Sequence, residues 1–373
     1  MRCVRPIGIA VALTLAGCAI PVSKLPELPA DVVAAEQRRE QIAQLRKYYG
    51  ELHRVDSIAF RLRTANVADC KDWVSAQIGL YAATPRSLPR KYQSYTAEAL
   101  NIGWMRPTAI SVAEDSPAAK AGIVAGDEII ALNGELIPLW GTAGWMGGWL
   151  KANGVKPVEV AVRRDGADRV VTVTPVMGCA IPITYIVDAD ANASASDTKI
   201  TINTGIVALA ETDAQLALVI GHEMAHSNLG HNDKKRWNQI LGIASGGAID
   251  LGIFAGGVST GGAFARQFGN YGGQAFSVNF EREADYVGAY YTARAGYDLK
   301  GVEEVWRRMG LVSPASILPN KSHPVTAARF VQLQKVTAEI EEKKRRHAPL
   351  VPDLKYVTVE HDPAPDETAA AKF

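Results

Sequence analysis

The chain has 373 residues, of which 47% are hydrophobic and 21% are charged, and its formal net charge is +1. This length allows two or three domains, and the composition is that of a folded globular protein rather than a disordered or fibrous one. A nearly neutral chain has no general electrostatic attraction to nucleic acid or anionic lipid, so we expect no nucleic-acid partner.

The first residues have the pattern of a targeting segment. Arg2 and Arg5 precede an apolar run at 7–16 that is too short to span a membrane as a mature helix. The run leads into Leu-Ala-Gly-Cys18, which resembles the lipobox of bacterial lipoproteins. The resemblance implies that residues 1–17 are a signal peptide, that Cys18 is lipidated and, since no aspartate follows, that the protein is sorted to the outer membrane; the alternative is an ordinary signal peptide with an incidental cysteine. We therefore expect a periplasmic protein, held at the membrane by a lipid anchor in an oxidising compartment.

The next part of the chain predicts a tether and a long helix. Residues 18–30 contain several prolines, which favour an extended tether. Apolar residues at roughly helical spacing then predict a helix from about residue 31 to residue 63, with a break near Gly50. We expect this helix to pack on a catalytic domain; the alternative is a coiled coil that binds a partner.

A β-rich pattern follows, and its clearest part is 116–134. This stretch predicts a short helix ended by Gly122, a turn at Gly126, a strand and an Asn-Gly turn. Two alternating strands near 158–163 and 169–175 are joined by an Asp-Gly hairpin signal. The central motif resembles a PDZ domain of the bacterial protease type.

A PDZ domain binds extended peptides, often C-terminal ones, by adding a strand to a sheet edge. The resemblance places the carboxylate-binding loop near residues 100–103, which match the usual glycine-rich loop poorly. Trp140, Trp145 and Trp149 lie in a glycine-rich insertion. We expect these tryptophans to pack the domain; the alternative is that they line a peptide groove.

The pattern His222-Glu223-Met-Ala-His226 lies in an apolar helical stretch that opens with a capping-box pattern, Thr212-Asp-Ala-Gln215. Two histidines four residues apart lie on one face of a helix, so both can bind one tetrahedral Zn²⁺. Glu223 lies where a carboxylate can act as general base on the attacking water. The sequence therefore predicts two metal ligands and a base.

A catalytic zinc site needs a third protein ligand. Glu281, Glu283 and Asp285 fall within five residues of a predicted helix and would repel one another. A metal on Glu281 and a histidine N–H on Asp285 would remove the repulsion, so we predict Glu281 as the ligand and Asp285 as the residue that orients a ligand histidine. Glu283 is then a surface residue or the partner of an arginine. The alternative is a solvated acidic helix face.

These motifs together resemble the M48 zinc metallopeptidases. The resemblance rests on the HExxH pattern at 222–226, the Glu281-x-x-Ala-Asp285 pattern, and Ser-His323-Pro followed by Arg329. It implies one zinc ion per chain, held by the two histidines of the first motif and by Glu281. It also implies that His323 lies near the metal, as a transition-state stabiliser or as a switchable ligand. His231, five residues after His226, does not fit the spacing of a metzincin third ligand, and we expect it to be structural.

We predict an α+β fold: a mainly helical, zincin-like metallopeptidase domain with a small β-sheet, plus an inserted β-rich PDZ-like domain. The predicted divisions are a signal peptide at 1–17, a tether at 18–30, an N-terminal helical part of the peptidase domain at 31–94, the PDZ-like domain at 95–178, the M48-like domain at 179–346 and a flexible tail at 347–373. Cys70 and Cys179 bracket the insertion, and in an oxidising compartment we predict a disulfide between them.

The expected function is that of a zinc endopeptidase of the bacterial envelope. Its substrates would be unfolded or misassembled envelope proteins, and its partners the envelope assembly machinery. A substrate would pair with an edge strand formed by Lys199, Ile200, Thr201, Ile202 and Asn203. The alternative is a self-inhibited or non-catalytic chaperone or adaptor lipoprotein that binds peptides through its PDZ-like domain. The glycine-rich stretch 241–273 predicts a mobile flap or a loosely helical loop over the active site or, alternatively, a contact with the membrane surface.

Overall fold

The structure is a computed structural model that describes Ser23 and residues 25–71, 73–87, 90–274, 277–312, 323 and 326–353. The predicted signal peptide, Cys18 and residues 354–373 of the predicted tail lie outside the described residues. The helices are α1 (Ala30–Ala65), η1 (Val67–Cys70), η2 (Pro85–Ser87), α2 (Arg90–Leu100), α3 (Pro117–Lys120), α4 (Thr142–Asn153), α5 (Thr204–Leu209), α6 (Asp213–Asn228), α7 (His231–Ala255), α8 (Ala263–Gln274), α9 (Ser277–Arg294), α10 (Glu304–Val312) and α11 (Ala327–Arg345).

The strands form three sheets. They are β1 (Val74–Gln77), β2 (Leu80–Ala83), β3 (Thr108–Val112), β4 (Glu128–Leu132), β5 (Glu135–Leu136), β6 (Val158–Arg164), β7 (Ala167–Val173), β8 (Val176–Cys179), β9 (Ile183–Ile186), β10 (Ala193–Ala195) and β11 (Ile200–Asn203). The largest sheet has the order β2-β3-β4-β6-β7, with β5 on β4; β1 pairs with β8, and β10-β11-β9 form a small separate sheet. The fold is α+β, as predicted.

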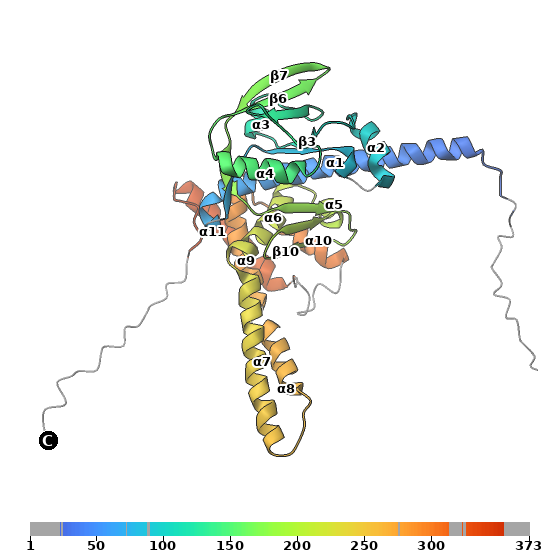
Figure 1. The fold of residues 1–373 in the computed structure, drawn as a ribbon. Coiled ribbons are helices and arrows are strands. Elements are labelled where there is room, and N and C mark those ends of the chain that lie inside the picture. Colours follow the sequence, from blue (N-terminus) through green and yellow to red (C-terminus); the bar gives the residue numbers. More distant parts are fainter. Residues whose placement is uncertain are drawn as a thin grey trace, which may run out of the picture.

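The long helix α1 passes between the two halves of the molecule (Figure 1). It is continuous from Ala30 to Ala65, so the break predicted near Gly50 is absent. The peptidase-side core gathers apolar side chains of α1, α6, α9, α10, α11 and the small sheet. A second core lies inside the PDZ-like half and is built from β2, β3, β4, β6, α3 and α4. Two separate hydrophobic cores, with α1 between them, are the arrangement expected when one domain is inserted into another.

The contact between α6 and α9 places the metal-binding motifs next to each other. A Cβ at Gly221 would lie 2.9 Å from the Gly288 carbonyl oxygen, and one at Gly288 would lie 2.8 Å from the His222 nitrogen. Only glycine at both positions lets the two helix backbones come this close. The approach brings His222 on α6 opposite Asp285 on α9.

The PDZ-like half begins earlier than residue 95, where the sequence places its start. Strand β2 (Leu80–Ala83) is the edge strand of the large sheet and pairs with β3. Strands β1 and β8 pair antiparallel and form the neck that joins this half to the peptidase core. The sequence did not predict β2 because this strand is short and its residues do not alternate between polar and apolar.

A disulfide between Cys70 and Cys179 lies at the base of this neck, as predicted. The two cysteines are 109 residues apart, and Cys179 ends β8 opposite Val74. The bond closes the whole insertion into a loop whose two ends are also held by the β1–β8 pair.

We expect replacement of both cysteines by serine to lower the free energy of unfolding by about 2–4 kcal/mol, because the cross-link restricts the unfolded chain over a long loop. Urea unfolding of oxidised wild type and of the double variant measures this difference. Oxidised and reduced wild type should differ by a similar amount. Equal midpoints for all three samples would contradict the prediction.

Helices α7 and α8 form a hairpin that projects from the body (Figure 1). The two helices approach closely, since a Cβ at Gly242 or Gly246 would lie 2.1 or 2.2 Å from a carbonyl oxygen of α8. The stretch 241–273 is therefore a helical hairpin, and the predicted flap over the active site is wrong. The high glycine content led to the prediction of a loop, but in the structure these glycines let the two helices pack closely. No helix among the described residues is long and apolar enough to cross a membrane.

The small sheet corrects the predicted substrate strand. β11 lies in the centre, antiparallel to β10 on one side and parallel to β9 on the other. The strand predicted at 199–203 therefore has no free edge, and β10 is an edge strand instead. Sequence alternation identifies a strand but does not say which strands border it.

Candidate metal centre

Helix α6 carries the HExxH motif and begins where the sequence predicts. The Thr212 hydroxyl accepts a hydrogen bond from the Gln215 N–H at 3.2 Å, and the Gln215 side chain accepts one from the Glu211 N–H at 2.9 Å. These bonds satisfy free N–H groups at the helix start. The next turns are buried on all sides, so the motif lies inside the core rather than on a surface.

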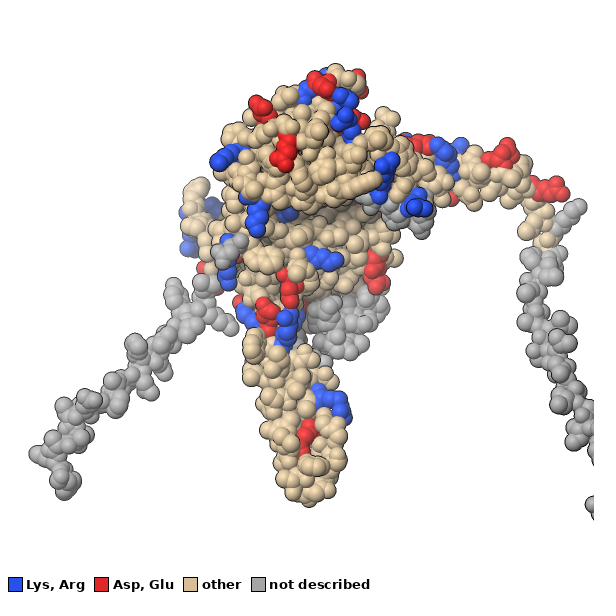
Figure 2. Space-filling view, in the orientation of Figure 1, with Lys and Arg blue, Asp and Glu red and all other residues tan. Residues whose placement is uncertain are grey.

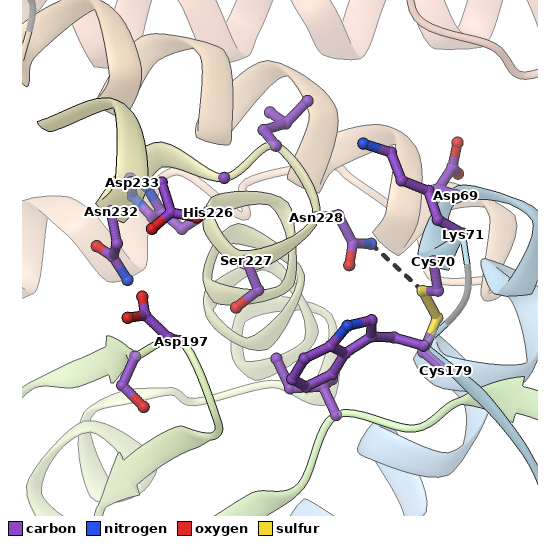
Figure 3. Close-up of a pocket in the computed structure, with 15 residues that line it drawn as sticks. Asp69, Cys70, Lys71, Cys179, Asp197, His226, Ser227, Asn228, Asn232 and Asp233 are labelled. Carbon is purple, nitrogen blue, oxygen red and sulfur yellow. Dashed lines mark hydrogen bonds between the residues drawn. A yellow bond between two sulfur atoms is a disulfide. The ribbon is translucent and has the colours of Figure 1, made fainter. Parts of the chain in front are cut away.

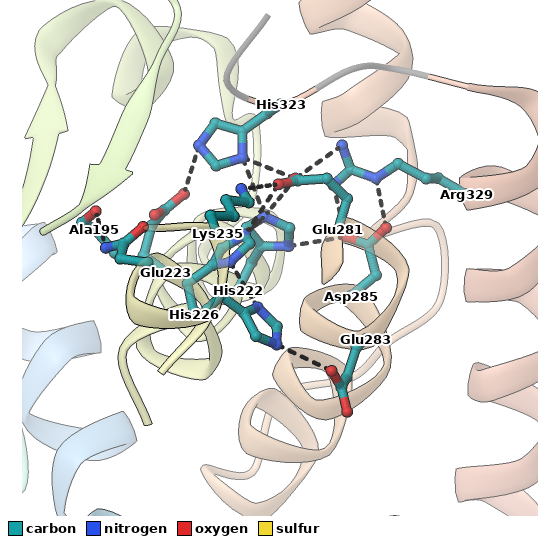
Figure 4. Close-up of polar contacts among 12 residues, drawn as sticks. Ala195, His222, Glu223, His226, Lys235, Glu281, Glu283, Asp285, His323 and Arg329 are labelled. Atoms are coloured by element: carbon teal, nitrogen blue, oxygen red, sulfur yellow. Dashed lines mark hydrogen bonds and ion pairs between the residues drawn. The ribbon is translucent and has the colours of Figure 1, made fainter. Parts of the chain in front are cut away.

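Four side chains converge on one point above α6 (Figure 4). His222, His226, Glu281 and His323 each offer one ligand atom, and these atoms lie within 4.8 Å of one another. The two Nε2 atoms of His222 and His226 are 3.1 Å apart, and each lies 3.3 Å from a Glu281 oxygen. His323 contributes Nδ1, at 3.4 Å from His222 Nε2 and 2.8 Å from Glu281 Oε2.

The distances among His222, His226 and Glu281 are close to those of a tetrahedral zinc site. With metal–ligand bonds of about 2.0–2.1 Å, the ligand atoms of a tetrahedron are about 3.3–3.4 Å apart. Glu281 Oε1 is buried and accepts no hydrogen bond; the nitrogen atoms beside it are His226 Nε2 at 3.3 Å and Lys235 Nζ at 3.6 Å. A bare acceptor surrounded by imidazole nitrogens is the environment that a bound cation would complete. The residues present therefore fit zinc, with His323 in the fourth position.

Asp285 and Arg329 form the layer behind these ligands. Asp285 Oδ1 accepts a hydrogen bond from His222 Nδ1 at 3.0 Å, which directs His222 Nε2 toward the centre. Arg329 donates to Asp285 through Nε at 2.6 Å and through Nη2 at 2.7 Å. All three side chains are fully buried. Asp285 thus occupies the orienting position that the sequence predicts, and Arg329 balances its charge.

His231 supports the second ligand, a contact that sequence reasoning missed. Its Nδ1 lies 2.8 Å from His226 Nδ1, and its Nε2 donates to Glu283 Oε2 at 3.0 Å. Since Nε2 donates to the carboxylate, Nδ1 accepts from His226, which leaves the other His226 nitrogen free for a metal. Glu283 is a surface residue, as predicted, with its side chain 47% exposed, and it pairs with a histidine rather than with an arginine.

Glu223 lies at the rim of the centre. Its Oε1 is 3.4 Å from His323 Nε2, and its Oε2 is buried without a hydrogen-bond partner. The Glu223 carboxylate is therefore not one of the four converging metal donors but lies beside them. This placement is suited to a group that handles a proton.

The two ligand histidines carry different charges in the metal-free protein. Burial by itself lowers the pKa of His222, but its hydrogen bonds to Asp285 and Glu281 outweigh burial and raise that pKa to about 9. Burial lowers the pKa of His226 to about 3, and the neighbouring charge of His222 adds to this effect. Burial also tends to raise the pKa of Glu281, yet the surrounding histidines hold it well below its ordinary value.

Zinc binding at pH 8 should therefore release about one proton. An ordinary histidine with a pKa of about 6.5 is almost entirely neutral at that pH, whereas His222 must lose its proton before its nitrogen can bind metal. Titration calorimetry of the metal-free protein in buffers of different ionisation enthalpy measures the release. Asp285→Asn should reduce it, because this substitution removes a carboxylate that raises the His222 pKa. Zinc binding with no proton release in wild type would show that His222 is neutral.

A cavity of about 270 Å³ has His226 in its wall (Figure 3). It is lined by both cysteines of the disulfide, by Trp73, and by Asp197 and Asn232. The Asn232 amide donates to the Ala195 carbonyl oxygen at 3.0 Å, which ties the start of α7 to the end of β10. The cavity therefore opens where the edge strand β10 approaches the metal centre.

The comparisons with known proteins agree with this division of the chain. Residues 181–337 match the model of peptidase family M48, and residues 109–164 match the model of the PDZ domain. The comparison with curated proteins found no match.

Among solved structures, the PDZ domain of HtrA3 bound to a phage-derived ligand is 21% identical, covers 28% of this chain and 88% of that chain, and has a TM-score of 0.23. The HtrA-type protease AlgW with a decapeptide is 20% identical, covers 28% of this chain and has a TM-score of 0.23. This chain spans only 30% of the length of that protease. The chain therefore contains a peptidase family M48 domain at residues 181–337 and a PDZ domain at residues 109–164.

Proposed function

We propose that the protein is a zinc-dependent endopeptidase of the bacterial cell envelope. One observation carries the proposal: three ligand atoms of a buried centre are spaced for tetrahedral zinc, with a free carboxylate, Glu223, beside them. The same arrangement without Glu223 would support a structural metal site only.

A zinc ion at this site would polarise the scissile carbonyl and make water a stronger acid. Glu223 would take the proton of the attacking water and later pass it to the leaving amine. Asp285 would keep His222 oriented and Arg329 would hold Asp285 in place. His231 would do the same for His226.

Strand β10 is the surface on which a substrate would bind. It is an edge strand, it ends at Ala195 and it is tied to the start of α7 next to the centre. An extended polypeptide that pairs with β10 by backbone hydrogen bonds would continue into the cavity beside His226. Backbone pairing tolerates many sequences, which supports unfolded or misassembled envelope proteins as the substrate class and the envelope assembly machinery as partners.

We place the protein in the periplasm, anchored through a lipid on Cys18 and sorted to the outer membrane. The surface of the α7–α8 hairpin supports a location of the protein at a membrane. Large exposed apolar side chains gather on it, including Trp237, Leu251 and Phe254, and Figure 2 shows few charged residues over its surface. Beyond residue 236 the hairpin carries two charged residues: Asp250 accepts bonds from Thr260 and from the backbone of α8, and Arg266 donates to the Gly261 carbonyl oxygen. Charges satisfied internally in this way are compatible with an apolar environment.

The second candidate function is a self-inhibited peptide-binding lipoprotein. The observation that favours it is His323, whose Nδ1 lies 3.4 Å from His222 Nε2 and 2.8 Å from Glu281 Oε2, so that it would fill the position that a catalytic zinc site keeps open.

Cleavage of casein by zinc-loaded protein tests both candidates. We expect cleavage by wild type, its loss with a chelator and its return with zinc. His323→Ala should raise the initial rate because it opens the fourth position. Cleavage only by the variant would establish self-inhibition, and cleavage by neither protein would refute the endopeptidase. A lower rate in the variant would instead give His323 a role in stabilising the transition state.

A further inference from the structure

Apolar side chains cover the hairpin of α7 and α8 from its base to its tip. Only two of residues 237–274 are charged, Asp250 and Arg266. Trp237 is 63% exposed, Leu251 70% and Phe254 65%. Figure 2 shows charged atoms gathered where the hairpin leaves the body and few over the rest of it. An apolar surface of this extent marks a contact with another molecule or with a membrane.

The exposed side chains of α7 point in several directions rather than along one stripe. Gly246 faces α8, where its close approach to the neighbouring backbone lies. At 3.6 residues per turn, Ile243 and Ile249 lie on opposite flanks of that position, and Leu241 and Leu251 lie on the outer side of the helix. All four are exposed. A second copy of the chain would cover one face of the hairpin, whereas a bilayer surrounds it, so this arrangement favours lipid.

A collar of charged residues, 233–236, bounds the apolar surface at the base of the hairpin. Its sequence is Asp-Lys-Lys-Arg, and Trp237 follows directly. Arg236 pairs with Asp197 at 2.5 Å and with Asp233 at 3.6 Å. Tryptophan is enriched where the headgroups of a membrane meet its hydrocarbon, and charged side chains remain on the water side of that boundary. The order of charge, tryptophan and apolar residues along α7 therefore matches the cross-section of a membrane surface.

The polar groups of the hairpin bond inside it, as an environment of hydrocarbon requires. At the tip, the N–H groups of residues 256–258 donate to carbonyl oxygens in the last turn of α7. The two charged side chains also bond to groups of the hairpin. The apolar part of α7, residues 237–255, is about 28 Å long at a rise of ~1.5 Å per residue. The tip can therefore enter the hydrocarbon layer, which is ~30 Å thick, and the chain returns on the same side without crossing.

The collar is also part of the wall around the metal centre. Lys235 Nζ lies 3.6 Å from Glu281 Oε1, and Figure 4 shows this side chain among the converging ligands. His231, one turn before Lys235, contacts His226. α7 is one continuous helix from His231 to Ala255, so the hairpin is joined directly to the residues that surround the metal. A membrane surface at the level of the collar would therefore lie beside the metal centre.

We propose that the α7–α8 hairpin is a membrane anchor that does not depend on the lipid on Cys18. Its apolar part enters the bilayer, the collar stays among the headgroups, and the metal centre is held at the membrane surface. The peptidase would then act on polypeptide segments that lie at this surface in preference to chains free in solution. This substrate preference rests on the proposed endopeptidase function, whereas the anchor does not.

Flotation with vesicles tests the anchor on the unlipidated chain 19–373, which retains every described residue. Vesicles of phosphatidylcholine have no net charge, so binding to them measures apolar insertion rather than attraction between charges. We expect wild type to float with these vesicles. Phe254→Ala should bind about 10–100-fold more weakly, the range for burial of one large apolar side chain, and Phe254→Glu should not float. Val170→Glu is the matched control, because Val170 is 66% exposed on β7 of the PDZ half and should not affect flotation.

Several results would overturn the anchor. Wild type that does not float is one, and equal flotation of wild type and Phe254→Glu is another, since the contact would then lie elsewhere on the chain. Flotation only with vesicles that contain phosphatidylglycerol would show that attraction between charges is sufficient. A dimer that does not float and that Phe254→Glu dissociates would make the hairpin an interface between copies of the chain.

The position of the metal centre is tested with one fluorogenic peptide in two forms, free in solution and attached to a vesicle lipid. Zinc-loaded wild type should cleave the attached form faster at equal concentration. Phe254→Glu should cleave the free form at the wild-type rate but lose this preference. Flotation of wild type without the preference would overturn a metal centre at the membrane surface. Flotation with no cleavage of either form would refute the endopeptidase and support the anchor alone.

Discussion

Replacement of Glu223 by glutamine is expected to lower kcat on casein or a fluorogenic peptide by about 10²–10⁴-fold, the contribution of a positioned general base. Glu223 Oε2 has no hydrogen-bond partner, and Oε1 lies 3.4 Å from His323. The amide is nearly the same size but cannot accept a proton. Zinc content and thermal stability should therefore remain those of wild type.

A matched control is Glu211→Gln, which alters a carboxylate just before the same helix. Glu211 is exposed and pairs with Arg308 rather than with the metal centre, so kcat should stay within about twofold of wild type. The inactive Glu223→Gln protein should also retain substrates, and those that co-purify from the envelope would identify the natural ones. Near-wild-type cleavage by zinc-loaded Glu223→Gln would remove the endopeptidase assignment.

Replacement of Arg329 by alanine should lower the free energy of unfolding by about 3–5 kcal/mol, as expected when one partner of a buried ion pair is removed. Arg329 makes two hydrogen bonds to Asp285 and lies 3.7 Å from Glu281. Its guanidinium also stacks on the Trp306 ring at 4.9 Å. Without it, the buried Asp285 carboxylate would keep its hydrogen bond to His222 but lose both bonds to a cation.

Urea unfolding of metal-free protein measures this loss, since bound zinc would mask part of it by stabilising the native state. Arg329→Lys should recover only part of the stability, because a lysine cannot make the paired hydrogen bonds of a guanidinium. Arg282→Ala is the control: Arg282 is exposed and bonds Gln332, so its change should stay within about 0.5 kcal/mol. Unchanged stability of Arg329→Ala would show that Asp285 is neutral in the folded protein.

Residue spacing within one helix was sufficient to predict that α6 presents two imidazoles to one candidate metal centre. His222 and His226 are four residues apart, and Thr212 with Gln215 opens the helix, so local geometry alone places both imidazoles on one face. The role of Asp285 followed from charge repulsion along a single helix turn. The cysteine positions likewise bracketed the insertion and predicted the observed disulfide.

Contacts between distant segments could not be predicted in this way. His231 reaches His226 within a short segment, but its partner Glu283 comes from α9, and no periodicity relates the two helices. The central position of β11 depends on strand order, which alternation does not encode. The glycines of α7 and α8 have the composition of a loop, and only the packing of one helix on the other shows why they are needed.

The sequence by itself therefore determined the chemistry of this protein: the capped HExxH helix, the downstream acidic motif and the PDZ pattern each depend on residues a few positions apart. The tertiary structure decided where that chemistry is used. It made β10 an edge strand and brought His323 next to His222 and Glu281 at the candidate metal centre. The reason is physical, because ligand spacing on a helix is local, whereas strand order, close helix approach and shared cavities arise only when separate segments pack together.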